Sequence, residues 1–194
     1  MTARDLPILS LGTGARTMNI QQIHHVAYRC NDAKETVDFY TQVLGMEFLM
    51  AMAEDKAPST KADDPYMHVF FDAGMGNILA FFELPNSPPM QRDPNTPDWV
   101  QHIALQVADE DALMVAKATA QTAGLDVVGP TDHEVFKSIY FFDPNGHRIE
   151  ITTVTAKPGI AERLKAIAPA MVEEWSRTKR PPRHAAWVHE KEFS

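Results

Sequence analysis

Residues 132–152, "DHEVFKSIYFFDPNGHRIEIT", have the pattern of two β-strands joined by a tight turn. An alternating run that ends in aromatic residues is followed by Asp-Pro-Asn-Gly at 143–146 and by a second alternating run. This pattern predicts a β-hairpin with a four-residue turn. Because side chains alternate across a strand, Glu150 lies on the face opposite to Ile149 and Ile151. The hairpin is therefore expected to carry a carboxylate away from the hydrophobic core.

An internal repeat surrounds this hairpin. Residues 24–46, "HHVAYRCNDAKETVDFYTQVLGM", and residues 101–126, "QHIALQVADEDALMVAKATAQTAGLD", both begin with His-aliphatic-Ala on an alternating run. Each then passes through an acidic cap into a helical pattern that ends at a glycine. His25 opens the first unit and His102 opens the second. A repeat of this kind predicts two copies of one supersecondary unit.

Each predicted helix is followed by three predicted strands. These strands cover residues 47–52, 66–72 and 77–84 in the first unit, and residues 126–128, 138–142 and 147–153 in the second. A helix on one face of a small sheet leaves the other face uncovered, so two such units are expected to join around a shared cavity. The predicted fold class is therefore α+β, with two βαβββ modules forming a curled mixed sheet around a metal-binding cavity, and with a C-terminal helical tail.

The expected boundaries divide the chain into a leader, two modules and a tail. The leader covers residues 1–18, module 1 about 19–86, a proline-rich linker about 87–97, module 2 about 98–155, and the C-terminal helix and tail 156–194. A proline interrupts the helical pattern of the tail. The tail is expected to pack on the surface of its own chain, over the pocket mouth or on a neighbouring subunit. A homodimer is therefore one of the expected assemblies.

The composition is that of an ordinary globular protein. The chain has 194 residues, of which 44% are hydrophobic and 23% charged, enough for one domain with a sizeable core. The net charge is -8 and no basic stripe is present, so nucleic acid is not expected as a partner. No apolar run is long enough to span a bilayer, and the start of the chain does not have the pattern of a signal peptide. The single cysteine, Cys30, cannot form an internal disulfide and is interpreted as a small buried hydrophobe, so a cytoplasmic protein without a membrane partner is expected.

Strand parity places three potential metal ligands on one surface. In residues 26–30 and 103–107 the bulky apolar side chains share one face, and His25 and His102 have the opposite phase. Glu150 has the same phase relative to the isoleucines beside it. Three such ligands, with adjacent positions left open, are typical of non-haem Fe(II) sites, where substrate and oxygen bind side by side. We therefore predict a metal site formed by His25, His102 and Glu150.

The repeat and the closing sequence "DPNGHRIEI" at 143–151 resemble the vicinal oxygen chelate superfamily over about residues 20–155. This superfamily includes glyoxalase I, methylmalonyl-CoA epimerase, bleomycin-resistance proteins and type I extradiol ring-cleavage dioxygenases. By this resemblance, glyoxalases and many epimerases take a fourth ligand from the last strand of the first module. The corresponding residue here is Ala80, and Glu83 has the opposite phase. The resemblance therefore favours a three-ligand site, as in the dioxygenases.

The second module also resembles the signature of extradiol enzymes. Its residues match that signature in order, with acceptable gaps, at Thr131, His133, Ile139, Tyr140, Asp143, Pro144, Gly146 and Glu150. The resemblance implies that His133 and Tyr140 hydrogen-bond oxygen atoms of the substrate or intermediate. The chain departs from the signature at Asn77, which stands at or near the position of the usual acid-base histidine. An amide cannot shuttle a proton at neutral pH, so His68 or His133 must do so or the reaction is different.

The predicted function is an oxidoreductase, an Fe(II)-dependent extradiol-type dioxygenase that cleaves a catechol-like aromatic diol with O2. Fe(II) is the expected metal, and Mn, Zn, Ni and Co are alternatives. One rival is a metal-dependent lyase or isomerase of the glyoxalase or epimerase kind, in which the ion stabilises an enediolate. The other rival is a non-catalytic, resistance-type binding protein, which typically lacks the ligand triad. In each case the expected partner is a small molecule.

Overall fold

The computed structural model of the chain describes residues 19–57 and 59–181. The first module consists of β1 (Val26–Cys30), α1 (Ala33–Gln42), β2 (Glu47–Lys56), β3 (Asp63–Asp72) and β4 (Ile78–Glu83). The second module consists of β5 (His102–Gln106), α2 (Glu110–Thr122), β6 (Val128–Asp132), β7 (Phe136–Phe142) and β8 (Arg148–Val154), and α3 (Ile160–Thr178) follows it. The predicted α+β class, with two similar modules and a C-terminal helix, is confirmed. The predicted leader, residues 1–18, and the last part of the tail, residues 182–194, lie outside the described residues.

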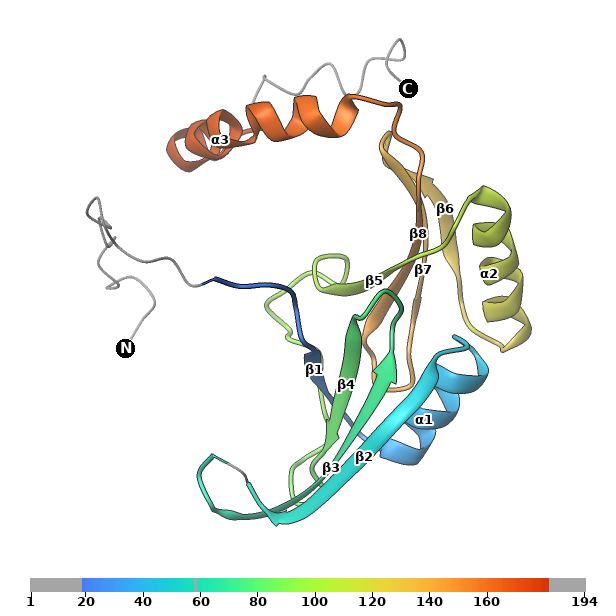
Figure 1. Cartoon of the computed structure of the whole chain (residues 1–194), viewed down its shortest axis with the longest axis vertical. Coiled ribbons are helices and arrows are strands. Elements are labelled where there is room, and N and C mark those ends of the chain that lie inside the picture. The colour runs from blue at the N-terminus through green and yellow to red at the C-terminus, as the bar shows by residue number, and fades with distance from the viewer. Residues whose placement is uncertain (1–18, 58, 182–194) are drawn as a thin grey trace.

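Each module forms its own four-stranded mixed sheet. Sheet A has the strand order β1-β4-β3-β2, and sheet B has the equivalent order β5-β8-β7-β6. The first strand of each module is parallel to its neighbour, β1 to β4 and β5 to β8, and the other pairings are antiparallel. Figure 1 shows α1 and α2 on the same side of the two sheets, and α3 projecting away from the end of β8. The opposite surface of each sheet carries no helix of its own module, and we call it the open face.

The helices begin and end where local chemistry requires. The Asp32 carboxylate accepts a hydrogen bond from Glu35 N at 2.8 Å, and Asp109 accepts one from Ala112 N at 2.8 Å, so each caps the first turn of its helix. Gly45 and Gly124 follow α1 and α2 with φ of 70° and 83°, a left-handed conformation that glycine adopts without strain. The acidic caps and terminal glycines of the repeat are thus confirmed.

The hydrophobic core lies between the helices and the sheets. One continuous cluster of buried side chains extends through both modules and includes Phe39, Tyr40, Phe71, Phe81, Leu113, Ile139 and Ile149. Cys30 belongs to this cluster, and burial raises the pKa of its thiol to about 11. The thiol therefore stays protonated and unreactive at neutral pH, as expected for a cysteine that serves as a small hydrophobe.

Two elements differ from the prediction because of proline. The strand predicted at residues 126–128 instead covers Val128–Asp132 and contains Pro130. This strand is β6, which lies at the edge of sheet B, where a residue without an N–H group removes no ladder hydrogen bond. Pro169 lies inside α3, and the helix continues through it. The helical pattern on both sides of Pro169 is long enough to form a helix without the missing hydrogen bond.

A buried turn joins the two modules. Asn145, in the turn between β7 and β8, accepts a hydrogen bond from Asn31 N at 2.8 Å and donates one to Thr36 Oγ1 at 3.1 Å. The Tyr40 hydroxyl of α1 donates to Asp143 Oδ2 at 3.1 Å. The side chains of Thr36, Tyr40, Asp143 and Asn145 are all buried. Hydrogen bonds made away from water in this way fix the second module on the start of α1, because unpaired polar atoms there would be costly.

We expect Asn145→Ala to lower the free energy of unfolding by about 2 to 4 kcal/mol, because the substitution leaves buried polar groups of both modules without partners. The measurement is urea denaturation followed by circular dichroism. Asn95→Ala is the matched control, because Asn95 lies exposed in the linker and bonds only locally to Asp93. Equal stability of the two variants would contradict this account of the module junction.

Candidate metal centre

His102 and Glu150 meet on the open face of sheet B. They come from the neighbouring parallel strands β5 and β8, and His102 Nε2 lies 2.9 Å from Glu150 Oε2. The Nδ1 atom of His102 lies 3.1 Å from the carbonyl oxygen of Val100. A proton on Nδ1 that is donated to this carbonyl leaves the Nε2 lone pair directed toward the carboxylate. The histidine and the carboxylate thus present one donor atom each to the same point.

The other oxygen of Glu150 is held by two hydroxyl groups. Ser138 Oγ donates to Glu150 Oε1 at 2.5 Å, and the Tyr140 hydroxyl donates to it at 3.2 Å. His133 Nε2 lies 2.7 Å from the same tyrosine oxygen. Since the tyrosine proton points to Glu150, His133 supplies the proton of this second hydrogen bond. The result is a chain of hydrogen bonds from His133 through Tyr140 to Glu150.

Burial keeps the Tyr140 hydroxyl of this hydrogen-bond chain protonated. Glu150 is only 4% exposed. Desolvation raises the pKa of Tyr140 above its usual value, and the nearby Glu150 carboxylate reinforces that rise. Tyr140 is therefore a neutral hydrogen-bond donor at neutral pH. The structure brings together four of the five predicted site residues, namely His102, His133, Tyr140 and Glu150.

The geometry of the pair fits a bound divalent ion. Two ligand atoms that bind one metal at right angles, each at about 2.1 Å, lie about 3 Å apart. The 2.9 Å between His102 Nε2 and Glu150 Oε2 matches this separation. The remaining atoms of both groups are already hydrogen-bonded to Val100 and Ser138, as is usual for side chains that bind a metal. Ser138 was missed in the sequence, although its spacing of two from Tyr140 places both on one face of β7.

His25 lies apart from this pair. It directly precedes β1 on the open face of sheet A, where its Nδ1 lies 2.8 Å from His24 Nδ1. Its ring centroid is 6.3 Å from that of His68 and 6.1 Å from that of Phe70. Within residues 19–57 and 59–181, no three His, Cys, Asp or Glu side chains gather closely enough to hold a metal. The described part of one chain therefore presents the predicted triad as two separate groups.

Strand register defines the equivalent residues of the two modules. Ala27 pairs with Ala80 in sheet A, as Ala104 pairs with Glu150 in sheet B. The methyl group of Ala80 thus stands where the second module has its carboxylate. Glu83, the nearest acidic residue of β4, accepts a hydrogen bond from Ala33 N at 2.7 Å and caps α1. Sheet A therefore carries no carboxylate at the position of a fourth ligand.

Asn77 has a local role in the turn before β4. Its Nδ2 donates to the carbonyl oxygen of Gly74 at 2.9 Å, and its side chain is exposed. This contact holds the turn between β3 and β4. A proton-transfer group of the first module must therefore be sought among other side chains.

His68 is the functional candidate that sequence reasoning undervalued. It lies on β3, is only 6% exposed, and stacks on Phe82 with ring centroids 3.5 Å apart and an interplanar angle of 18°. Burial, together with the charge of nearby His25, lowers the pKa of His68 to about 4. Its imidazole is thus neutral at physiological pH. An isolated histidine in a strand has no sequence signal that distinguishes it from a surface residue.

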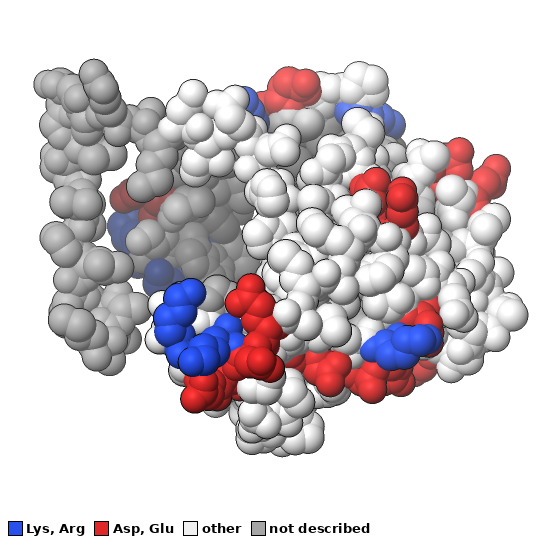
Figure 2. Space-filling model, turned by 60° about the horizontal axis from the view of Figure 1, so that its bottom comes forward, with Lys and Arg blue, Asp and Glu red and all other residues white. Residues whose placement is uncertain are grey.

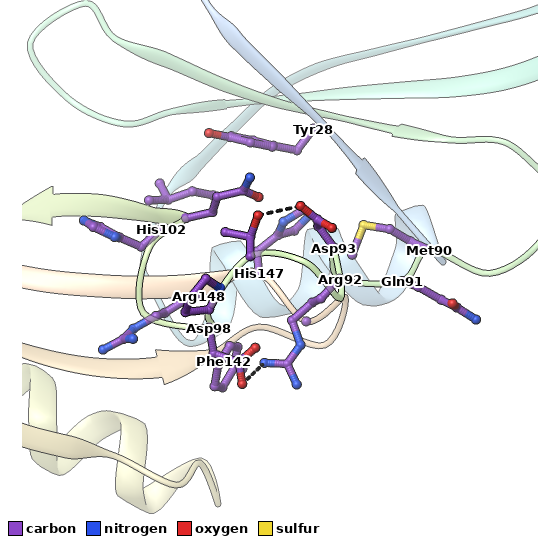
Figure 3. A pocket seen from close by; sticks show the side chains of 15 residues that line it. Tyr28, Met90, Gln91, Arg92, Asp93, Asp98, His102, Phe142, His147 and Arg148 are labelled. Carbon is purple, nitrogen blue, oxygen red and sulfur yellow. Dashed lines mark hydrogen bonds and ion pairs between the residues drawn. The ribbon is translucent and has the colours of Figure 1, made fainter. Parts of the chain in front are cut away.

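A small pocket opens beside His102. It has a volume of about 160 Å³ and lies between the proline-rich linker and the strands β5 and β8. Figure 3 shows Arg92 of the linker and Asp98, which directly follows the linker, near Phe142, with His102 and Arg148 coming from the strands. The Arg92 guanidinium lies 4.6 Å from the centroid of the Phe142 ring and 3.2 Å from Asp98. The linker thus forms one wall of the approach to the histidine.

The surface charge and the character of the helices bear on the possible partners of the described part of the chain. Figure 2 shows acidic side chains spread over the face in view, interrupted by a few basic ones, without a continuous basic patch on that face. Among the described residues, none of the helices has the length and apolar character that crossing a membrane requires.

Two βαβββ modules in sequence, with the His102 and Glu150 pair on the open face of the second sheet, define a class of duplicated α+β proteins. The chain belongs to the Glyoxalase/Bleomycin resistance protein/Dioxygenase superfamily, whose family model matches residues 22–151. Members of this superfamily are metal-dependent, and most of them are enzymes.

Individual relatives have different activities. The chain is 29% identical over 144 residues to the putative ring-cleaving dioxygenase MhqA of Bacillus subtilis, a match of 66% of this chain and 42% of that protein. It is 27% identical over 158 residues to a 2-epi-5-epi-valiolone epimerase of an Actinomyces species, covering 74% of this chain and 85% of that enzyme. A solved glyoxalase/dioxygenase structure from Nostoc punctiforme superposes with a TM-score of 0.56 at 23% identity, covering 75% and 99% of the two chains. That superposition supports the fold alone.

The buried imidazole of His68 predicts a specific loss of stability in acid. Its pKa is about 4 in the folded protein and about 6.5 in the unfolded chain, so the unfolded state binds the extra proton first. The contribution of His68 is complete above pH 6.5 and is lost as the pH falls toward 4, by about 3 kcal/mol at most. We expect the unfolding free energy of His68→Phe, measured in urea from pH 7 to 4, to decrease less steeply than that of the wild type. Parallel curves would show that His68 is not buried in its neutral form.

Proposed function

We propose that the protein is a metal-dependent dioxygenase of the extradiol type that cleaves a catechol-like ring with O2, and that Fe(II) is its metal. The observation that carries the proposal is the His102 and Glu150 pair, with donor atoms 2.9 Å apart. The hydrogen-bond chain through Tyr140 and His133 supports it, because it places a neutral phenol and an imidazole next to the carboxylate. The similarity to MhqA, which extends over 42% of that protein's length, points to the same reaction class.

The side chains around the pair would have distinct roles in this reaction. When bound, Fe(II) supplies adjacent positions for the diol and for O2. Ser138 and Tyr140 hold Glu150 in the orientation that a metal ligand requires. Tyr140 now donates to Glu150, and His133 donates to Tyr140. In the proposed reaction a substrate oxygen would replace the Glu150 contact and accept the Tyr140 proton, so that Tyr140, supported by His133, would stabilise negative charge on that oxygen.

We propose further that a second copy of the chain completes the site. His25 is the third predicted ligand, and it lies on the open face of sheet A rather than beside Glu150. Contact between the open face of sheet A in one subunit and that of sheet B in the other would bring these groups together. In a dimer with two-fold symmetry the same contact occurs twice, so two complete sites would form.

Exposed apolar surface supports this dimer. The strands β1 and β5 are edge strands of their sheets, and an apolar groove of about 720 Å³ lies between them. Ile23 and Val26 in this groove are 63% and 38% exposed. The strand β2 also exposes several large apolar side chains, namely Phe48, Leu49, Met50 and Met52. Unpaired strand edges and contiguous apolar surface are typical of regions that another chain covers.

One observation favours a second candidate function. The epimerase relative is matched over 85% of its own length, and an isomerase of that kind needs a metal and a base. The same His102 and Glu150 pair could hold the ion in that reaction. Oxygen consumption separates the two candidates, because an isomerase consumes none.

We expect the full-length protein, reconstituted anaerobically with Fe(II), to consume O2 in the presence of at least one member of a panel of substituted catechols. Glu150→Gln should lower the rate more than about 100-fold, because it removes the anionic ligand of the ion. Glu83→Gln is the matched control, since that carboxylate caps α1 and should leave the rate nearly unchanged. The measurement is oxygen-electrode kinetics with iron quantified by a colorimetric chelator. Tight binding of Zn, Ni or Co, with no oxygen consumption on any diol, would contradict the dioxygenase assignment and favour the isomerase.

Complementation tests the shared site. His25→Ala and His102→Ala should each be inactive, but a refolded equimolar mixture should recover about a quarter of the wild-type activity. This follows because half of the dimers are mixed, and each mixed dimer contains one site with His25 from one subunit and His102 from the other. A mixture that stays inactive, although affinity capture of one of two differently tagged variants shows mixed dimers, would place the whole triad within one subunit.

A further inference from the structure

Four equivalent positions differ between the open faces of the two sheets. His68 pairs with Phe82 in sheet A as Ser138 pairs with Thr152 in sheet B, and Phe70 pairs with Ala80 as Tyr140 pairs with Glu150. In sheet B three of these positions, Ser138, Tyr140 and Thr152, form the hydrogen-bond network that holds Glu150. In sheet A they form an aromatic surface around one imidazole, that of His68. The carboxylate that such an imidazole could bind is replaced by the methyl group of Ala80.

The Nε2 atom of His68 is consequently a buried polar atom without a hydrogen-bond partner among the described residues. The ring lies 3.5 Å from that of Phe82 and 4.0 Å from that of Phe70, measured between centroids. An unsatisfied buried nitrogen destabilises the fold, and native proteins rarely leave one. A bound ligand that forms a hydrogen bond with this nitrogen would remove that destabilisation.

The surroundings of His68 indicate what kind of ligand that is. Aromatic rings flank it on β3 and β4, and Met52 stands opposite it on β2. Flat aromatic side chains and methionine bind an aromatic ring well. The nearest potential metal ligand, His25, has its ring centroid 6.3 Å away. A ring that stacks on this surface could therefore carry one oxygen toward His68 and others toward the metal.

We infer that the open face of sheet A binds the aromatic ring of the substrate, and that His68 Nε2 forms a hydrogen bond with a phenolic oxygen of that ring. His68 is then a specificity-determining residue that selects hydroxylated aromatic rings over hydrocarbons of the same shape. The inference rests on the proposed function for its aromatic substrate and extends it to a residue outside the predicted triad. The inference also explains why sheet A, which has Ala80 at the position of Glu150, carries aromatic side chains on its open face.

The test uses two monofunctional probes that cannot chelate a metal, 4-chlorophenol and chlorobenzene. Each is titrated into the full chain as purified, with ¹⁵N-labelled histidine, and NMR records the Kd and the His68 Nε2 shift. The wild type should bind 4-chlorophenol about tenfold more tightly than chlorobenzene, the ratio expected of one hydrogen bond. The His68 Nε2 signal, assigned by its loss in His68→Phe, should move with the phenol and not with chlorobenzene.

The variants give the decisive comparison. The preference for the phenol should fall to about one in His68→Phe, recover partly in His68→Gln, and remain tenfold in the control Glu83→Gln. An unchanged preference in a folded His68→Phe protein, or an unmoved Nε2 signal in the wild type at saturating phenol, overturns the inference. A preference that depends on His68 in a protein that consumes no oxygen upholds the inference and rejects the dioxygenase proposal. Oxygen consumption without a preference for the phenol upholds the dioxygenase proposal and rejects the inference about His68.

Discussion

The hydrogen bonds of Asn145 hold the two halves of the molecule in their relative position. This side chain bonds across the module junction to Asn31 and Thr36, and Asp143 of the same turn bonds to Tyr40. These contacts are buried, so they are made without competition from water. The turn also joins β7 to β8, which carry Tyr140 and Glu150. The position of the candidate metal centre relative to the first module therefore depends on this turn.

Strand alternation places the candidate ligand of the β7–β8 hairpin on the open face of sheet B. On β8, Ile149 and Ile151 are buried in the core while Glu150 projects to the open face between them. Neighbouring strands then supply His102, Ser138 and Tyr140 at the level of the carboxylate. The same strand order in the first module carries aromatic side chains and the imidazole of His68, whose Nε2 atom has no hydrogen-bond partner among the described residues. The duplication thus produces one polar face suited to an ion and one apolar face suited to an organic ring.

Much of this organisation could be predicted from local patterns. The repeat was visible because each unit begins with a histidine before Val26 or Ile103 and ends its helix at a glycine. Parity predicted the faces of His102 and Glu150, because each alternates with apolar neighbours, Ile103 in one strand and Ile149 and Ile151 in the other. The roles of Ser138 and His68 could not be predicted in this way. Serine and histidine in a strand acquire a role only through their neighbours on adjacent strands, and those neighbours are distant in sequence.

The sequence by itself determined the elements, their order and the face on which each candidate ligand lies, because capping, turns and strand alternation depend on neighbouring residues in the chain. Only the tertiary structure decided which of those faces meet. It placed Glu150 beside His102, left His25 with His68 on the other sheet, and buried an imidazole against Phe82. These distances depend on which strands pair within each sheet and in which register. Strand pairing joins residues far apart in the chain, just as the docking of the two sheets does. Docking is set by buried contacts between residues far apart in the chain, which no local pattern specifies.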